Sequence, residues 1–357
     1  MAGDLALAGH DVSFMLYPDQ SDCLEACRAA GGIRMGEPAG ETISGKSGLG
    51  VPRILTDDPA EALAGADLVV MDVVAAELET RAAGLIPHLE NGQVLHVNTY
   101  GYWPGFRLAK ALREADKAGV TVTESIAPTI SANRNGADVT PRFVRRTMPV
   151  SAFPANRTEA AMEKIPAIVK SLEICRNVVA TNFENINMLI HPAMALLNVG
   201  YFDRSEAEGK AASFYGTGNT QHAGKLAESL SDERHPICEA YGVRYRSVLE
   251  HIHGLYGGTG ESVHEAVGAS AFYREVGDLS AGIWRNWLAI DLPQAQVPFV
   301  LLAENAKRAV PLHRGFVDIA GALLDLNLWE DGLTLERLGI HGLAPAEITA
   351  YAETGKR

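Results

Sequence analysis

Residues 53–74 read RILTDDPAEALAGADLVVMDVV, and this run contains one complete strand–helix–strand unit. Residues 53–56 form a short strand, Asp58-Pro59 begins a helix rich in Ala and Leu, and residues 66–74 form a second strand that is apolar nearly throughout. A strand that is apolar on both faces is typical of a parallel sheet covered by helices on both sides. This unit therefore predicts an α/β fold with a doubly wound parallel sheet.

The same alternation extends in both directions along the chain. Further strands are predicted at residues 12–17, 93–98 and 120–124, and further helices at residues 2–9, 78–89 and 105–118. From about residue 182 helical spacing continues without strands, in the segments 182–203, 222–241, 243–254, 261–268 and 294–325. We therefore expect two domains, a dinucleotide-binding Rossmann-like domain at residues 1–182 and an all-helical substrate and catalytic domain at residues 183–357.

The predicted first domain begins inside its first helix. A doubly wound sheet of this kind opens with a strand, and a glycine-rich turn then leads into a helix that holds a pyrophosphate at its N-terminus. Neither the strand nor a G-x-G-x-x-G turn precedes the helix at residues 2–9, so both are expected ahead of Met1. The alternative is a real loss of both, which would leave two neighbouring strands with unpaired backbone groups.

The composition narrows the range of partners. With 31 basic and 44 acidic side chains, the formal net charge is −13, which argues against nucleic acid or a membrane surface as a partner. The start of the chain lacks a signal-peptide pattern, and the longest apolar run, around residues 67–76, is too short to span a bilayer. None of the four cysteines has a zinc-binding or CxxC spacing, so we expect free thiols, no metal site and a cytoplasmic protein.

The segment at residues 182–200, NFENINMLIHPAMALLNVG, carries the most chemical information. Asn187 and His191 are four residues apart and share one helix face. Pro192 lacks an amide hydrogen, so it releases the carbonyl of Met188 and bends the helix. Such a bend would turn Asn187 and His191 toward the cleft between the domains. The alternative is an amphipathic core helix whose histidine is satisfied by hydrogen bonds.

Within this segment, NINMLIHPAMALLNVG resembles the hallmark of the opine (octopine/nopaline) dehydrogenase family, in which Pro follows the catalytic His. Three further segments resemble the family in the same order along the chain. They are ESIAPTISANRNGADV at residues 124–139, FYGTGNTQHAGKLAESLSDERHPICEAYGV at residues 214–243, and a segment that starts WLAIDLPQ at residue 287. The resemblance covers nearly the whole chain.

The resemblance implies an NAD(P)H-dependent reductive condensation of an amino acid with a 2-oxo acid. A reduced nicotinamide would deliver hydride to the imine carbon. His191 would transfer a proton, for which an imidazole suits neutral pH. Asp291 would hold the His191 ring and stabilise its charged form. Asp291 could also be a helix N-cap, because Pro293 follows at a position that proline favours near a helix start, and the two roles are compatible.

Two departures from the family pattern leave the substrate open. Where the family has an Arg that grips a substrate carboxylate, five residues before the catalytic Asp, this chain has Asn286, with Arg285 beside it. An amide cannot make the bidentate contact of a guanidinium. The family's Cys after the last Rossmann strand is replaced by Asn133, while Arg134 is kept. We take Asn187, Asn133, Arg134, Arg285 and Asn286 as candidate substrate-binding residues.

Residues at the ends of the predicted strands are candidates for binding the cofactor. Tyr17 occupies the usual place of an acidic ribose-binding residue, and Asp19 lies two positions on. No arginine follows to receive a 2′-phosphate, which favours NAD slightly over NADP. The remaining candidates end later strands and would border the nicotinamide: Val74, Ala75, Asn98, Gly101 and Glu124.

Two other functions remain open at this point. A related dehydrogenase of the hydroxyacid or ketopantoate reductase type would reduce a simple carbonyl, and Asn286 in place of Arg permits it. A non-catalytic binding protein that has lost its cofactor site is the third possibility. The expected partners are small-molecule substrates, and a homodimer is possible.

Overall fold

The structure is a computed structural model that describes residues 1–145, 147–165 and 172–357. The chain divides into two compact units. The first contains residues 1–100 and 108–174, and the second contains residues 101–107 and 175–357. The division falls before the expected boundary at residue 182, because the helix at Val178–Phe183 belongs to the second unit. The short segment 101–107 also joins the second unit, although it directly follows a strand region of the first.

The first unit contains the predicted parallel strands. Strands β5 (Leu68–Asp72), β6 (Val94–Asn98) and β7 (Thr121–Ser125) pair in parallel and in sequence order. Strand β10 (Met148–Phe153) adds antiparallel to β7, and β11 (Leu172–Ile174) completes a sheet of order β11-β10-β7-β6-β5. The Rossmann-like fold class is confirmed, with an antiparallel strand added beyond β7.

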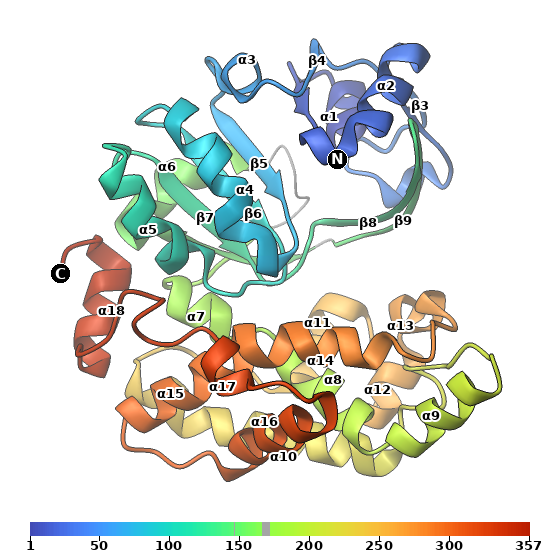
Figure 1. Cartoon of the computed structure of the whole chain (residues 1–357), viewed down its shortest axis with the longest axis vertical. Helices are drawn as coiled ribbons and strands as arrows, with labels where there is room; N and C mark the ends of the chain where they lie inside the picture. Colours follow the sequence, from blue (N-terminus) through green and yellow to red (C-terminus); the bar gives the residue numbers. More distant parts are fainter. Residues whose placement is uncertain (146, 166–171) are drawn as a thin grey trace. The chain divides into compact units, whose positions relative to one another are not determined.

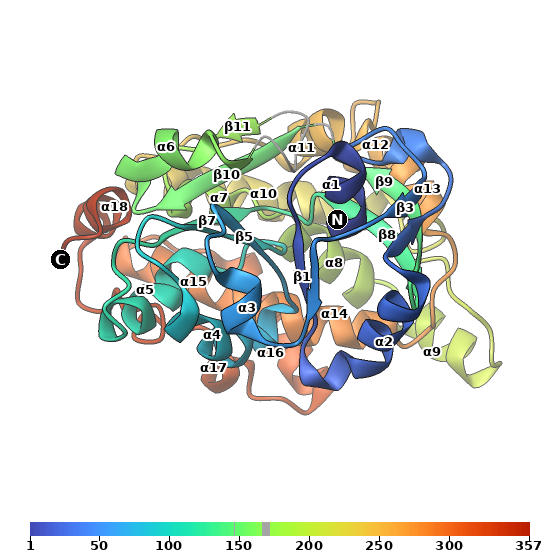
Figure 2. The same ribbon diagram turned by 90° about the horizontal axis from the view of Figure 1, so that it is seen from above.

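Two further sheets complete the strands of this unit. Strands β1 (Ser13–Met15) and β4 (Ile54–Thr56) form a parallel pair that stands apart from β5 (Figures 1 and 2). A cavity of about 880 Å³ lies between them, lined by Phe14 of β1 and Val70 of β5 among others. The third sheet, of order β3-β2-β9-β8, was not predicted; its strands are Gly48–Gly50, Ile33–Met35, Asp138–Val144 and Ile130–Asn135.

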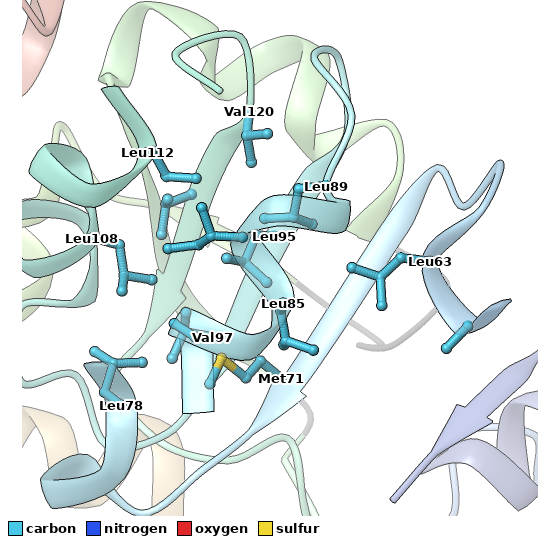
Figure 3. Packing of buried hydrophobic residues seen from close by; sticks show 14 residues of the cluster. Leu63, Met71, Leu78, Leu85, Leu89, Leu95, Val97, Leu108, Leu112 and Val120 are labelled. Carbon is cyan, nitrogen blue, oxygen red and sulfur yellow. The ribbon is translucent and has the colours of Figure 1, made fainter. Parts of the chain in front are cut away.

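Helices pack on the five-stranded sheet through a core of aliphatic side chains (Figure 3). Leu95 and Val97 project from one face of β6 and are fully buried against Leu85 of α4 (Leu78–Leu85) and Leu108 of α5 (Pro104–Glu114). The intervening residue, His96, points to the opposite face, where its Nδ1 lies 3.1 Å from the hydroxyl of Thr123. The alternation along β6 confirms a strand buried on both faces. The other helices of the first unit are α1 (Ala2–Ala8), α2 (Ser21–Ala30), α3 (Pro59–Leu63) and α6 (Thr158–Met162).

The second unit is helical, as predicted (Figure 1). Its helices are α7 (Val178–Phe183), α8 (Asn187–Leu196), α9 (Val199–Ala207), α10 (Gln221–Ala240), α11 (Val248–Tyr256), α12 (Val263–Ala269), α13 (Ala271–Val276), α14 (Ile283–Asp291), α15 (Val297–Asn305), α16 (Pro311–Leu324), α17 (Leu328–Asp331) and α18 (Pro345–Thr354). A π-helical turn at Leu292–Gln296 joins α14 to α15. Within the described part of the chain, no helix is both long and apolar enough to cross a membrane.

The single helix predicted at residues 182–203 is wrong, because asparagine side chains interrupt it. The side chain of Asn185 accepts a hydrogen bond from the backbone N–H of Asn187 at 3.0 Å, which starts α8 afresh after α7. Asn198 donates from its amide to the carbonyls of Met194 and Gly218, at 2.8 and 2.9 Å, and separates α8 from α9. Short polar side chains that bond to nearby backbone groups compete with helix continuation in this way.

Candidate active site

His191 and Asp291 meet in the helical unit, where α8 and α14 pack side by side (Figure 1). The Nδ1 atom of His191 lies 2.6 Å from Oδ2 of Asp291, and both side chains are buried. The Asp291 side chain makes no N-cap hydrogen bond to the turn that follows it. The prediction that the Asp291 side chain caps a helix is therefore wrong. Its carboxylate contacts the imidazole of His191 instead.

The backbone after Asp291 widens into the π-helical turn that contains Pro293. Single π-turns inside helices are frequent at functional sites, because the extra residue rotates the flanking side chains relative to a regular helix. Here the turn follows directly on the carboxylate that holds His191.

Tyr102 is a third member of the site, and its hydroxyl donates a hydrogen bond to Oδ1 of Asp291. It belongs to segment 101–107 of the helical unit. Gly101, Tyr102 and Trp103 all have left-handed backbone conformations, with φ of 83°, 66° and 63°. This conformation costs a non-glycine residue about 1–2 kcal/mol and is concentrated at functional sites.

Asn182 stabilises this turn from α7. Its Oδ1 accepts the backbone N–H of Trp103 at 2.7 Å, and its Nδ2 donates to the carbonyl of Val178 at 2.8 Å. A side chain on Gly101 would place its Cβ 3.2 Å from the same Oδ1. Gly101, proposed from the sequence as a strand-end residue at the nicotinamide, thus lies in the turn that presents Tyr102.

Aromatic side chains enclose the rest of the His191 ring. Its Nε2 lies 2.7 Å from the hydroxyl of Tyr215. Trp287 stacks on the ring face, with centroids 4.5 Å apart and planes 18° from parallel, and Phe214 meets the ring edge-on at 5.9 Å. Both nitrogens and one face of the imidazole are therefore occupied by side chains of the helical unit.

The other residues of α8 and α14 that the sequence predicted have different surroundings from this pair. Asn187 begins α8 one turn before His191. Arg285 is held by α9, with its guanidinium 3.2 Å from Asp203 and 2.8 Å from Glu206. Asn286 is exposed on α14. Residues four apart share a helix face and residues five apart do not, so Trp287, and not Asn286, lies on the same face as Asp291.

Asn133 and Arg134 lie in the first unit, on the exposed strand β8. The Nε of Arg134 donates to the carbonyl of Gly136 at 3.0 Å, and its guanidinium lies 5.7 Å from the ring centroid of Phe14. Arg134 also lines the cavity between β1 and β5. Arg134 therefore lies in the predicted nucleotide-binding domain, whereas it was predicted to bind the substrate.

At the end of β1, Tyr17 and Asp19 form a cluster with an arginine from α4. The guanidinium of Arg81 lies 4.4 Å from the Tyr17 ring centroid and pairs with both oxygens of Asp19, at 2.6 and 2.8 Å. Its Nε also donates to Glu77 at 3.0 Å. The hydrogen bond from Arg81 lowers the pKa of Asp19, and burial raises the pKa of Tyr17. Arg81 could not be predicted as a partner of Asp19, because the two residues lie 62 positions apart along the chain.

The remaining candidates at the strand ends differ in how far their side chains are exposed to solvent. Val74 follows β5 with 54% of its surface exposed, while Ala75 is buried. The Asn98 amide donates to Asp72, and its Oδ1 accepts the backbone N–H of Thr129 at 3.0 Å, so it ties β5 to the segment after β7. Glu124 is fully buried in β7.

These observations fit the adenosine end of a dinucleotide. The exposed apolar Val74 follows the carboxyl end of β5, and the Tyr17–Arg81 pair lies at the carboxyl end of β1. The carboxyl ends of the strands are where α/β sheets bind nucleotides. Asp19 adds a carboxylate of the kind that accepts ribose hydroxyls. A Rossmann-like unit of this kind, followed by a helical unit with a histidine–carboxylate pair, defines a class of two-part nicotinamide-dependent dehydrogenases.

Comparison with known proteins specifies this class further. Residues 174–324 match the family model of the NAD/NADP octopine/nopaline dehydrogenase alpha-helical domain. An opine dehydrogenase of Arthrobacter sp. (strain 1C) is 29% identical over 311 residues, or 87% of this chain and 85% of that protein. The chain is thus similar to an opine dehydrogenase over most of its length, and its helical unit resembles the helical domain of the octopine/nopaline dehydrogenases.

Solved structures agree with this fold. An octopine dehydrogenase in complex with NADH and agmatine is similar with a TM-score of 0.78 at 16% identity, over 100% of this chain and 95% of that chain. A ketopantoate reductase from Ralstonia eutropha JMP134 is similar with a TM-score of 0.56, also at 16% identity, over 91% of this chain and 94% of that chain.

Proposed function

We propose that this protein catalyses the nicotinamide-dependent reductive condensation of an amino acid with a 2-oxo acid. The observation that carries the proposal is the buried contact of 2.6 Å between His191 and Asp291, on a helix that matches the opine dehydrogenase family. A carboxylate on Nδ1 fixes the tautomer of the ring and stabilises its charged form. His191 can therefore take up and return a proton at Nε2.

The chemistry separates into two contributions. A bound reduced nicotinamide supplies the hydride that the imine carbon accepts. His191 and Asp291 supply the proton that the imine nitrogen needs, and Tyr102 holds the second oxygen of Asp291. The aromatic side chains of Trp287 and Phe214 exclude water from the histidine ring.

The cluster at Tyr17 supports NAD over NADP as the cofactor. A 2′-phosphate would need an unshared cation near Asp19, and the arginine there, Arg81, already pairs with Asp19 and Glu77. The two carboxylates outweigh the one guanidinium, so the local charge repels a further phosphate.

A matrix assay tests the proposed function directly. Amino acids are combined with 2-oxo acids, and the consumption of NADH and NADPH is followed, with His191→Ala as the control. We expect oxidation of NADH that requires both substrates and that falls about 10²–10⁴-fold in the variant. NADH binding by the variant should stay unchanged. Full turnover in His191→Ala would exclude the histidine from the reaction.

The second candidate function is the reduction of a simple carbonyl, which the structural likeness to a ketopantoate reductase favours. The same assay separates the two functions. Oxidation of NADH by an oxo acid in the absence of any amine would support carbonyl reduction and contradict the condensation.

The cavity between β1 and β5 bears on cofactor binding. We propose that it receives the strand predicted ahead of Met1, whose glycine turn would hold the pyrophosphate. Strands β1 and β5 flank the cavity, and one additional parallel strand would join the pair β1–β4 to the five-stranded sheet. A chain extended upstream by this strand should bind NADH, followed by cofactor fluorescence, far more tightly than residues 1–357 alone. Equal affinity of the two chains would contradict the proposal.

The cysteines support a cytoplasmic location. Cys27 and Cys238 are buried as free thiols, and Cys23 is partly buried. Proteins of oxidising compartments commonly pair such residues in disulfides.

A further inference from the structure

The Nε2 atom of His191 is covered by a tyrosine. Because both oxygens of Asp291 act as acceptors, from Tyr102 and from Nδ1 of His191, the neutral imidazole carries its hydrogen on Nδ1. Nε2 then has only a lone pair to offer. The Tyr215 hydroxyl, 2.7 Å away, donates into that lone pair.

The imidazole is also less accessible than the tyrosine that covers it. His191 keeps 8% of its surface exposed, with Trp287 on one ring face and Phe214 at an edge. Tyr215 is only half-buried. Of the four side chains joined as Tyr102–Asp291–His191–Tyr215, the last is therefore the one that a substrate reaches first.

Neighbouring rings hold Tyr215 in this position. Its ring centroid lies 4.7 Å from that of Tyr273 and 5.8 Å from that of Trp287. The preceding turn is fixed as well, since the backbone N–H of Ser213 donates to the Tyr201 hydroxyl at 3.0 Å. These contacts on several sides hold the Tyr215 hydroxyl at Nε2 of His191.

We infer that Tyr215 is the catalytic residue that touches the substrate and that it relays the proton between His191 and the substrate nitrogen. The inference rests on the proposed function. In the reductive direction the imine carbon accepts hydride from the reduced nicotinamide, and the C=N π electrons move to nitrogen. That nitrogen takes the proton of the Tyr215 hydroxyl, while the tyrosine oxygen takes the proton of His191 Nε2. The products are a secondary amine, the oxidised nicotinamide and a neutral imidazole.

Tyr215→Phe tests the relay, because it keeps the ring and removes only the hydroxyl. We expect kcat to fall at least about 10²-fold with little change in KM. Tyr201→Phe is the matched control: it removes a hydroxyl that supports the same turn but leaves Nε2 covered, and it should retain most turnover. Turnover of Tyr215→Phe at or above the normal level would overturn the relay, since the hydroxyl would then be a cap that substrate displaces.

The same variants separate this inference from the proposed function. If His191→Ala is inactive and Tyr215→Phe is active, only the relay fails. If His191→Ala is fully active, the relay fails and the histidine is excluded from the reaction. If the unaltered protein oxidises no NADH in the presence of both substrates, the proposed function itself fails.

A second measurement needs neither substrate nor cofactor. In protein that carries ¹⁵N-labelled histidine, the Nε2 resonance of His191 should have the shift of an unprotonated acceptor at high pH. It should move when Tyr215 is replaced by Phe and stay in place in Tyr201→Phe. An Nε2 resonance that ignores Tyr215→Phe would show that the hydrogen bond is absent and would overturn the relay.

Discussion

Asp291 is the residue on which the candidate site depends most. It accepts from Tyr102 with one oxygen and holds His191 with the other, at 2.6 Å. A carboxylate in this position favours the charged imidazole, whereas a neutral amide of the same shape can only present a dipole to it.

Asp291→Asn should lower turnover and change its pH dependence. The amide keeps the shape of the side chain and removes the charge, so the imidazolium loses its stabilisation. We expect a loss smaller than that of His191→Ala and a displaced limb in the profile of kcat/KM against pH. Steady-state rates between about pH 5 and 9 measure the effect, since imidazole side chains in general change charge within this range. An unchanged profile would remove Asp291 from the mechanism.

The sequence predicted part of this site. The helix position beside Pro192 made His191 a candidate but left a core histidine open. The catalytic role of His191 and the choice of Asp291 came from the family resemblance. Trp287 was within reach of prediction, since it lies four residues before Asp291 and so shares its helix face. Tyr102 and Tyr215 were not, because both contacts depend on turns whose geometry no periodicity reveals.

Among the elements, helix α1 and strand β3 approach so closely that a side chain cannot stand between them. A Cβ on Gly50 would lie 2.0 Å from the carbonyl oxygen of Gly3, a backbone atom that cannot turn aside. Glycine at both positions therefore lets the helix lie directly on the edge of the third sheet.

Gly50→Ala should destabilise the first unit by about 1–3 kcal/mol, the usual range for overpacking. Gly40→Ala is the control, because a Cβ there meets nothing within 4 Å. Denaturant unfolding followed by circular dichroism measures both variants. A Gly50→Ala protein as stable as the control would mean that α1 does not pack on β3.

Among the secondary-structure elements, the strands that are apolar on both faces were predicted best from the sequence. Strands β5, β6 and β7 all lie where their apolar runs indicated. Strands β8 and β9 were missed because they are largely exposed and have no such run. Their hairpin still carried a signal, Gly136, which stands at the first position of the two-residue turn Gly136-Ala137 with a φ of 57°. Glycine is typical of such turns, because they require a positive φ.

For the molecule as a whole, buried histidines connect stability to pH in both units. Burial lowers the pKa of His96 in the first unit to about 4 and that of His313 in the second to about 3. The folded protein keeps these rings neutral, while the unfolded chain protonates them near pH 6.5. Below that pH the unfolded state binds more protons, so stability is highest above it and falls as the pH decreases toward the folded-state values.

We expect the free energy of unfolding to fall below pH 6.5 by up to about 1.4 kcal/mol per pH unit for each such histidine. Replacement of His96 by Asn should flatten that slope for the first unit and leave the second unit unaffected. Denaturant titrations between about pH 7 and 5 measure the slope of the free energy of unfolding against pH. The prediction concerns this slope and not the stability of the variant at any one pH. A slope unchanged by the substitution would contradict a neutral His96 in the folded state.

The left-handed turn at Gly101–Trp103 has a consequence for protein engineering. Tyr102 is encoded among the strands of the first unit but belongs to the second, where it bonds to Asp291. A hybrid enzyme made by exchanging the C-terminal halves of two relatives at residue 174 would therefore combine the tyrosine of one parent with the aspartate of the other. Recombination that keeps the proton machinery of one parent intact requires two additional crossover points, on either side of residues 101–107.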